Sequence, residues 1–176
     1  FSSINHIGFM LLAIMSYQYM SEGTIFFYLI IYLITTFGVF SVILNLRTSE
    51  GEITFLTGLN GLKASSRSKA ISMLVFLFSL AGIPPFAGFF AKFFILSASI
   101  NEGFYILSVI AVISSVIAAF YYLSVIKNMF FNESDTELLL DNNRLSSFIF
   151  ISSAIIVTLF FFYPDPLINL VDSLFN

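Results

Sequence analysis

The sequence SLAGIPPFAGFFAKF, residues 79–93, places two consecutive prolines and a lysine inside an otherwise apolar stretch. Pro84 and Pro85 have no amide hydrogen, so the carbonyls of Leu80 and Ala81 lose their usual helical partners. Within a membrane, freed carbonyls are tolerated only where protein or water hydrogen-bonds them. Helices broken at mid-membrane are typical of transport sites. This stretch therefore predicts a helix that is interrupted inside a protein-packed, hydrated crevice.

The composition around this stretch is that of a membrane protein. The chain has 176 residues, of which 59% are hydrophobic and only 10% are charged, and its mean hydropathy is +0.99. A soluble domain carries about 25% charged residues, because its surface faces water. The charged side chains here are too few to solvate the exterior of a soluble domain of this size.

Residue counts also exclude classes of chemistry. The chain has no cysteine, so it can form no disulfide, thiolate metal site or iron–sulfur cluster. Its single histidine cannot supply a zinc site alone, and no glycine-rich phosphate-binding motif occurs. Few basic residues argue against nucleic-acid binding. We expect this chain to bind no metal, cofactor or nucleic acid, and to perform no redox chemistry itself.

Five long stretches lack the charges that a water-facing helix needs, and the third is broken at Gly82–Pro85. They span residues 4–20, 25–46, 70–99, 104–126 and 145–163. About 20 residues at 1.5 Å per residue cross the hydrocarbon core, and the runs are continuous rather than alternating. We predict an all-α integral membrane fold, with residues 1–176 forming a single membrane domain.

Charge placement predicts the orientation. With five helices, the N-terminus and the segments 47–69 and 127–144 share one face. Six of the seven basic residues lie there: Arg47, Lys63, Arg67, Lys69, Lys127 and Arg144. The positive-inside rule assigns that face to the cytoplasm or the mitochondrial matrix. Tyrosines of an expected interfacial belt fall near the opposite helix ends: Tyr17, Tyr19, Tyr28, Tyr105 and Tyr163.

Lys92 is the only lysine, arginine, aspartate or glutamate inside these predicted spans. A lysine near mid-membrane costs about 2.5–3.5 kcal/mol on insertion scales, which makes it a functional candidate. The alternative is a snorkelling anchor, because Lys92 precedes the end of its span by roughly 10 Å of helix. The pKa of a buried lysine responds to its surroundings, so it can load and release a proton. No carboxylate of this chain lies at that depth, so a charged partner must come from elsewhere.

Other polar residues are weaker candidates. His6 either relays a proton or is an interfacial hydrogen-bonding group at a helix start. Lys63, Arg67 and Lys69 either bind anionic lipid headgroups or simply mark topology. Residues 58–62 are expected to form a short surface segment.

These residues resemble a known family. Residues 79–93 closely resemble the broken, lysine-bearing helix of the antiporter-like subunits of proton-pumping NADH:quinone oxidoreductase, respiratory complex I. Within that group, residues 2–9 (SSINHIGF) are similar to a segment of NADH dehydrogenase subunit 2, and residues 28–40 to its next helix. The match is good from Ser2 to about Lys127. A lysine at position 92 fits subunit 2 better than subunit 4, where a glutamate is usual.

The resemblance implies that Lys92 is the ionisable residue of a proton half-channel and that His6 belongs to a central polar axis. It implies half of an inverted-repeat fold, with no redox centre in this subunit. NADH, FMN, iron–sulfur clusters and ubiquinone would be used by other subunits. We expect a C-terminal portion of subunit 2 whose N-terminal half is a separate or upstream polypeptide. Expected partners are the other membrane-arm subunits and phospholipids such as cardiolipin.

The expected location is the mitochondrial inner membrane, with the basic loops in the matrix; a bacterial plasma membrane is the alternative. Two other functions remain open. One is a subunit of a multisubunit cation/proton antiporter, which shares the helix pattern. The other is a structural membrane subunit that does not pump protons.

Overall fold

The computed structural model describes residues 2–20, 22–48, 51–52, 56–133, 138–140, 144–162, 169 and 173. Its helices are α1 (Ser2–Met15), α2 (Glu22–Ile43), α3 (Leu62–Ser65), α4 (Arg67–Ala81), α5 (Ala87–Asn101), α6 (Tyr105–Phe131) and α7 (Arg144–Phe162). Two short 3-10 helices are η1 (Tyr17–Tyr19) and η2 (Leu56–Leu59). Three short strands are β1 (Leu46–Thr48), β2 (Gly51–Glu52) and β3 (Leu138–Leu140).

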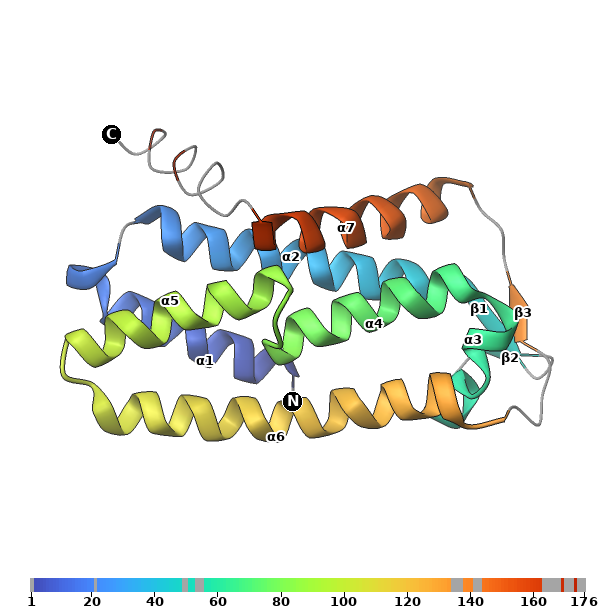
Figure 1. Cartoon of the computed structure of the whole chain (residues 1–176), viewed down its shortest axis with the longest axis horizontal. Coiled ribbons are helices and arrows are strands. Elements are labelled where there is room, and N and C mark those ends of the chain that lie inside the picture. The colour runs from blue at the N-terminus through green and yellow to red at the C-terminus, as the bar shows by residue number, and fades with distance from the viewer. Residues whose placement is uncertain are drawn as a thin grey trace.

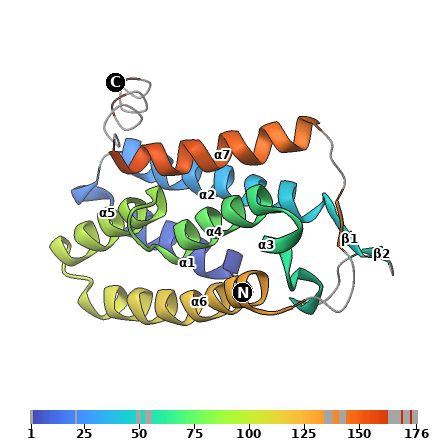
Figure 2. The same cartoon turned by 45° about the vertical axis from the view of Figure 1, so that its right-hand side comes forward.

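The long helices lie roughly along one axis and form an elongated bundle (Figure 1). α4 and α5 follow one another through its middle, with α6 along one side and α2 and α7 along the other (Figures 1 and 2). α1 covers only one half of the length of α6, and its first residues lie beside the junction of α4 and α5. The junction thus lies between α6 and α1 on one side and α2 and α7 on the other, while its two prolines remain exposed.

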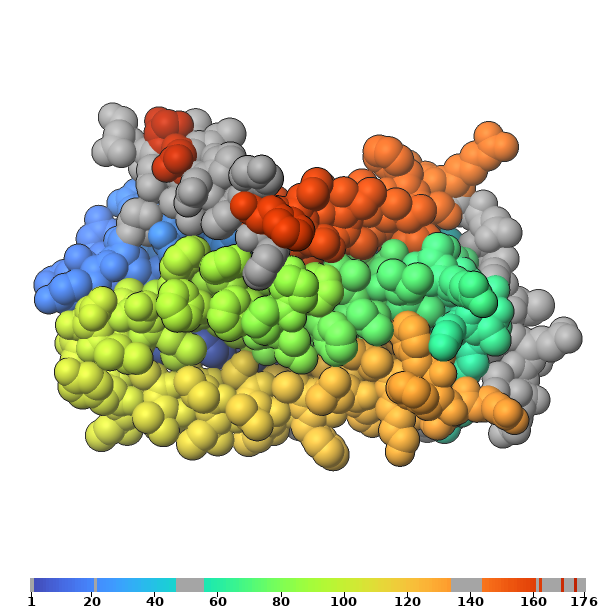
Figure 3. All heavy atoms as spheres, viewed as in Figure 1, coloured from blue at the N-terminus to red at the C-terminus, as the bar shows by residue number. Residues whose placement is uncertain are grey.

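The surface of the bundle is apolar. On α6, Ile106 and Phe120 are each 78% exposed and Val116 is 65% exposed, and Figure 3 shows α6 forming one edge of the molecule. Exposed apolar surface on this scale marks contact with a membrane or with other proteins. By length and composition alone, α2 and α6 could each cross a membrane, and the described residues include three shorter apolar helices.

The predicted third span is two helices. α4 ends at Ala81 and α5 begins at Ala87. Gly82 has φ +81°, a left-handed conformation that closes helices and suits glycine. The amides of Gly82 and Ile83 each donate to the carbonyl of Phe78 at 3.0 Å. The interruption occupies the residues where the prolines predicted it.

The two helices overlap rather than meet end to end. The amide of Gly88 in α5 donates to the hydroxyl of Ser79 in α4 at 3.1 Å. A Cβ atom at Gly88 would lie 2.0 Å from the Ser79 carbonyl oxygen. Because that atom belongs to backbone, only glycine allows this close approach.

The small sheet was not predicted. Its strand order is β2-β1-β3, and both pairings are antiparallel. Leu46 pairs with Leu140, whereas the sequence predicted a helix through residue 46 and loops elsewhere in this region. Strand pairing across some ninety residues is a tertiary interaction that a hydropathy profile does not contain. The helical fold class is confirmed, and the small sheet of two- and three-residue strands is an addition that the sequence did not predict.

Two further predictions about exposure were wrong. Residues 58–62 were expected at the surface, but Leu59 is 6% exposed and Leu62 is fully buried, because α3 and η2 pack under the end of the bundle. Tyr28 was expected in an interfacial belt and is 2% exposed. Tyr17 and Tyr105 are exposed as expected. Tyr163 lies outside the described residues.

Candidate functional site

Lys92 lies inside the bundle and is 5% exposed. Its ammonium donates to the carbonyl oxygens of Leu80 at 2.9 Å and Ala81 at 3.2 Å. It also donates to the hydroxyl of Ser115 on α6 at 2.9 Å. The two carbonyls are those that the prolines deprive of helical donors. The lysine therefore satisfies the backbone groups that the interruption exposes.

The geometry of the interruption brings these atoms together. Gly82 turns the chain away from α4, and a Cβ atom at this position would lie 2.9 Å from Cδ of Lys92. The Ser115 hydroxyl also lies 3.4 Å from the Ala81 carbonyl oxygen. On another side, the ammonium is 5.2 Å from the centroid of the Phe9 ring of α1, within reach of a cation–π interaction. Lys92 thus contacts α1, α4 and α6, which fix its position.

His6 is buried near the start of α1, with 3% of its side chain exposed. Its Nδ1 is 2.7 Å from the hydroxyl of Tyr28, and its Nε2 is 3.5 Å from the hydroxyl of Tyr122. The ring stacks on Tyr32 at 4.7 Å between centroids. The Tyr122 hydroxyl in turn forms a short hydrogen bond with Ser2. Residues of α1, α2 and α6 therefore hold this ring in one orientation inside the bundle.

His6 and Lys92 line the same small cavity. Tyr28, Thr35 and Ser79 contribute polar groups to its wall. The cavity volume is ≈ 10 Å³, near the lower limit for one water molecule. A buried cation and a buried imidazole thus share a space through which a water can connect them.

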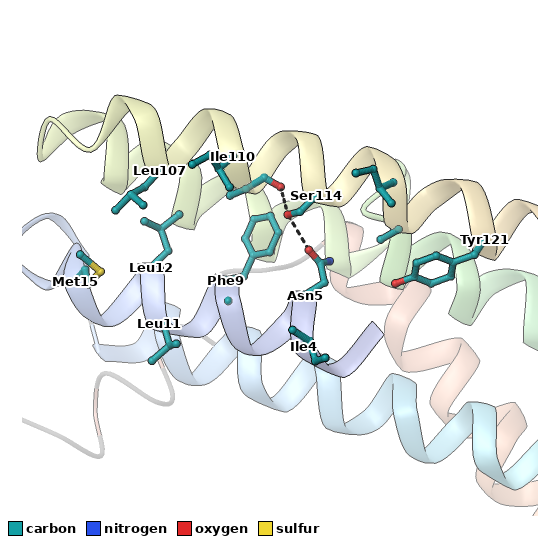
Figure 4. A pocket seen from close by; sticks show the side chains of 14 residues that line it. Ile4, Asn5, Phe9, Leu11, Leu12, Met15, Leu107, Ile110, Ser114 and Tyr121 are labelled. Atoms are coloured by element: carbon teal, nitrogen blue, oxygen red, sulfur yellow. Dashed lines mark hydrogen bonds between the residues drawn. The ribbon is translucent and has the colours of Figure 1, made fainter. Parts of the chain in front are cut away.

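A larger groove lies on the other side of Phe9. It runs between α1 and α6, has a volume of ≈ 460 Å³ and is almost entirely apolar. Figure 4 shows Asn5 and Ser114 facing each other across it; the Ser114 hydroxyl donates to Oδ1 of Asn5 at 3.0 Å. This bond ties α1 to α6 one residue before His6. Because Phe9 lines the groove and also faces the ammonium, its ring separates Lys92 from the groove.

The other predicted site residues have different environments. Gly82, Pro84 and Pro85 lie at the helix interruption, with both prolines exposed. Lys63 and Arg67 are exposed at the end of the bundle where α4 begins. Lys69 is only 3% exposed, and its ammonium donates to the carbonyl of Asn45 at 3.4 Å. The prediction that Lys69 binds a lipid headgroup is therefore corrected, because its ammonium is buried within the protein.

Sequence reasoning does not identify the hydroxyl groups around the two titratable side chains. Ser115 and Tyr122 come from α6, and Tyr28 comes from α2. The sequence predicted Tyr28 in an interfacial belt, because it lies near one end of its predicted helix. A serine pair in the middle of a long apolar span, Ser114 and Ser115, is a signal that could have indicated the polar face of α6.

Comparison with known proteins now identifies the family. A family model described as NADH:quinone oxidoreductase/Mrp antiporter, transmembrane, matches residues 1–118. The chain belongs to this family. The match includes α1, α2 and both halves of the interrupted helix, and so contains Lys92 and His6.

Relatives from this family are subunits of NADH-quinone oxidoreductase. Subunit N of Rhodospirillum rubrum is 43% identical over 78% of this chain and 28% of its own length. Subunit N of Parvibaculum lavamentivorans is 39% identical over 96% of this chain and 35% of its own length. This chain thus spans about a third of the length of these relatives.

A solved structure supports the fold. A chain of respiratory complex I from Thermus thermophilus, with bound aureothin, superimposes with a TM-score of 0.84 over 96% of this chain and 38% of the other. Sequence identity over that match is 24%. The arrangement of helices is therefore shared with a chain of that complex. Both subunit N relatives are bacterial, so the subunit 2 assignment and the mitochondrial location stay predictions.

Proposed function

We propose that this chain is part of a membrane-arm subunit of a proton-pumping NADH:quinone oxidoreductase, in which Lys92 carries a translocated proton. The observation that supports this most directly is the position of its ammonium, on the freed carbonyls of an interrupted helix. Ionisable groups inside a membrane are costly and mark ion pathways. The subunit N relatives support the same complex.

The proton path would run between Lys92 and His6. A proton leaving the ammonium passes to a water in the shared cavity, which passes one of its own to the imidazole. The lysine is then a neutral amine and the histidine an imidazolium. Tyr28 and Tyr122 orient the ring, and Phe9 keeps the apolar groove separate from the lysine.

The chain would cross the membrane five times, with α4 and α5 forming one interrupted crossing. Its exposed basic side chains at the end where α4 and α7 begin would face the mitochondrial matrix or the bacterial cytoplasm. The remaining part of the subunit and the other membrane-arm subunits would be its partners. NADH, FMN, iron–sulfur clusters and ubiquinone would be used by those other subunits.

Lys92→Met in the intact complex tests the proposal. Methionine keeps much of the side-chain volume but has no titratable group. We expect quinone-dependent NADH oxidation to continue while the proton-to-electron ratio in sealed vesicles falls, because the carrier of one proton is lost. Lys69→Met is the matched control: it also removes a buried lysine bound to a backbone carbonyl, but near the start of α4, and it should leave the ratio unchanged.

The outcomes separate three functions. An unchanged ratio in an assembled Lys92→Met complex would contradict the proposal and favour a structural subunit that does not pump. Sodium-dependent proton exchange by membranes containing the chain, without NADH oxidation, would favour a cation/proton antiporter. The same family contains both kinds of protein, and the subunit N relatives favour the oxidoreductase.

A further inference from the structure

The two ring nitrogens of His6 contact hydroxyl groups in different surroundings. Nδ1 lies 2.7 Å from the hydroxyl of Tyr28, which lines the small cavity that His6 shares with Lys92. Nε2 lies 3.5 Å from the hydroxyl of Tyr122, which is not among the residues that line this cavity. The imidazole therefore connects the wall of the Lys92 cavity with a hydroxyl group outside it.

The Tyr122 hydroxyl connects His6 to a second hydroxyl on α1. It forms a short hydrogen bond with Ser2. Ser2 precedes His6 by four residues, so the two side chains lie on one face of α1, and one hydroxyl group from α6 reaches both. Tyr122 is 4% exposed, whereas Ser2 is partly exposed. The three side chains thus form a row of polar contacts from a buried ring to the partly exposed start of a helix.

A further contact between the same two helices keeps this row aligned. The Ser114 hydroxyl donates to Oδ1 of Asn5 at 3.0 Å. Ser114 precedes Tyr122 by eight residues, or about two turns of α6, and Asn5 follows Ser2 by three residues on α1. Hydrogen bonds therefore join α1 to α6 at two levels, and His6 directly follows one of the joined residues.

We propose that Tyr122 and Ser2 transfer the proton between Nε2 of His6 and water at the start of α1. The inference rests on the proposed function, in which His6 becomes an imidazolium. Its Nε2 hydrogen passes to the Tyr122 oxygen while the phenol passes its own hydrogen to the Ser2 oxygen. The Ser2 hydroxyl passes its hydrogen to a water, which becomes hydronium. Both hydroxyls are restored, and the ring is left as a neutral imidazole with its hydrogen on Nδ1.

The chemistry of the two hydroxyls suits this transfer. A hydroxyl group can accept one hydrogen bond and donate another at the same time, so it passes a proton on without keeping a charge. The 3.5 Å contact at Nε2 is long for a hydrogen bond, and it would shorten when the ring is charged, because charged donors form shorter hydrogen bonds. The 2.7 Å contact at Nδ1 already fixes the ring.

Tyr122→Phe in the intact complex tests the proposal, because it removes the hydroxyl and keeps the ring. We expect NADH oxidation to continue while the proton-to-electron ratio in sealed vesicles falls to the value for Lys92→Met. Tyr121→Phe is the matched control on the same helix. Tyr121 lines the apolar groove (Figure 4), and its buried hydroxyl has no hydrogen-bond partner among the described residues. The ratio of the Tyr121→Phe complex should be unchanged.

Substitutions at Ser2 distinguish proton transfer from orientation of the ring. Ser2 bonds to the Tyr122 hydroxyl, so replacing it leaves the partners of the imidazole in place. Ser2→Val and Ser2→Thr introduce side chains of nearly equal shape, of which only threonine has a hydroxyl group. The valine variant should lose the same part of the ratio as Tyr122→Phe, and the threonine variant should retain it. Ser3→Val changes the exposed neighbouring residue and should have no effect.

The outcomes separate this inference from the proposed function. The double variant Lys92→Met/Tyr122→Phe should have the ratio of either single variant, because both residues serve one path. An unchanged ratio in assembled Tyr122→Phe, or equal ratios in Ser2→Val and Ser2→Thr, would overturn the inference, while a lowered ratio in Lys92→Met would still support the proposed function. An unchanged ratio in Lys92→Met would overturn both. If Tyr122→Phe does not assemble, the two Ser2 variants decide.

Discussion

At the scale of single residues, the hydroxyl of Tyr28 is the group that most clearly orients His6. The two atoms lie 2.7 Å apart in a buried site. Tyr28→Phe keeps the ring and removes the hydroxyl, leaving a buried ring nitrogen without this partner, at a cost of about 1–3 kcal/mol. We expect the assembled complex to oxidise NADH with a reduced proton-to-electron ratio, measured in sealed vesicles by a pH-sensitive dye.

Tyr32→Phe is the matched control for this prediction. Tyr32 contacts His6 through a stacked ring, which phenylalanine retains. The proton-to-electron ratio of the Tyr32→Phe complex should equal that of the unmodified complex. A loss of the same size in both variants would show that the hydroxyl of Tyr28 has no special part in proton transfer.

The two titratable members of the site could be predicted from the sequence, and their surroundings could not. Lys92 is conspicuous because an ionisable residue in an apolar run is rare, and the prolines identify the carbonyls near it. Which hydroxyl groups face Lys92 and His6 depends on the rotation of α2 and α6 about their axes. Both helices are apolar on most sides, so hydropathy does not reveal that rotation. The contacts of Ser115 with Lys92 and of Tyr122 with His6 are therefore seen only in the packed structure.

At the scale of elements, the contact between α4 and α5 depends on the missing side chain at position 88. Gly88→Ala places a methyl group 2.0 Å from the Ser79 carbonyl oxygen, so the two helices must separate. Overpacking of this kind costs about 1–3 kcal/mol, and we expect less assembled complex and a lower midpoint of thermal inactivation.

Gly8→Ala controls for the change from glycine to alanine within a helix. A Cβ atom at Gly8 meets nothing within 4 Å, and alanine favours helix by about 1 kcal/mol. Assembly and thermal stability should be unchanged or slightly improved. Equal losses in the two variants, measured on native gels and by heating, would contradict the role given to the α4–α5 contact.

Local signals explain which element boundaries were predicted correctly. The interruption follows from Pro84 and Pro85, whose effect on the backbone is local. The end of α6 was predicted at residue 126, but the helix continues to Phe131, because one lysine at position 127 does not stop a helix. β1 and β3 depend on pairing between distant segments, which no local pattern contains.

At the scale of the whole molecule, the bundle has one basic end. Lys63 lies near Phe130, at the end of α6, whereas Asn101 lies just before the start of α6. The 27 residues of α6 extend roughly 40 Å at 1.5 Å per residue, which exceeds the hydrocarbon thickness of a bilayer. The two residues should therefore lie on opposite sides of the membrane.

The chain has no cysteine, so a single introduced cysteine is the one maleimide-reactive thiol within these 176 residues. Lys63→Cys should react with an impermeant maleimide only from the matrix or cytoplasmic side of sealed vesicles. Asn101→Cys should react only from the other side. Both residues are exposed. Reaction of both from one side would contradict the crossing of α6.

The hydrogen bonds at the end of α4 also depend on whether Lys92 is protonated. A lysine ammonium has three N–H bonds, and three oxygens surround this one: those of Leu80, Ala81 and Ser115. A neutral amine keeps two N–H bonds and gains a lone pair, so one oxygen loses its donor. Ser115 can then reverse its role and donate to the nitrogen, which takes its hydrogen away from the Ala81 carbonyl. The loss of one proton would thus leave the Leu80 and Ala81 carbonyls with one N–H donor each and remove the Ser115 hydroxyl from the Ala81 carbonyl at the end of α4.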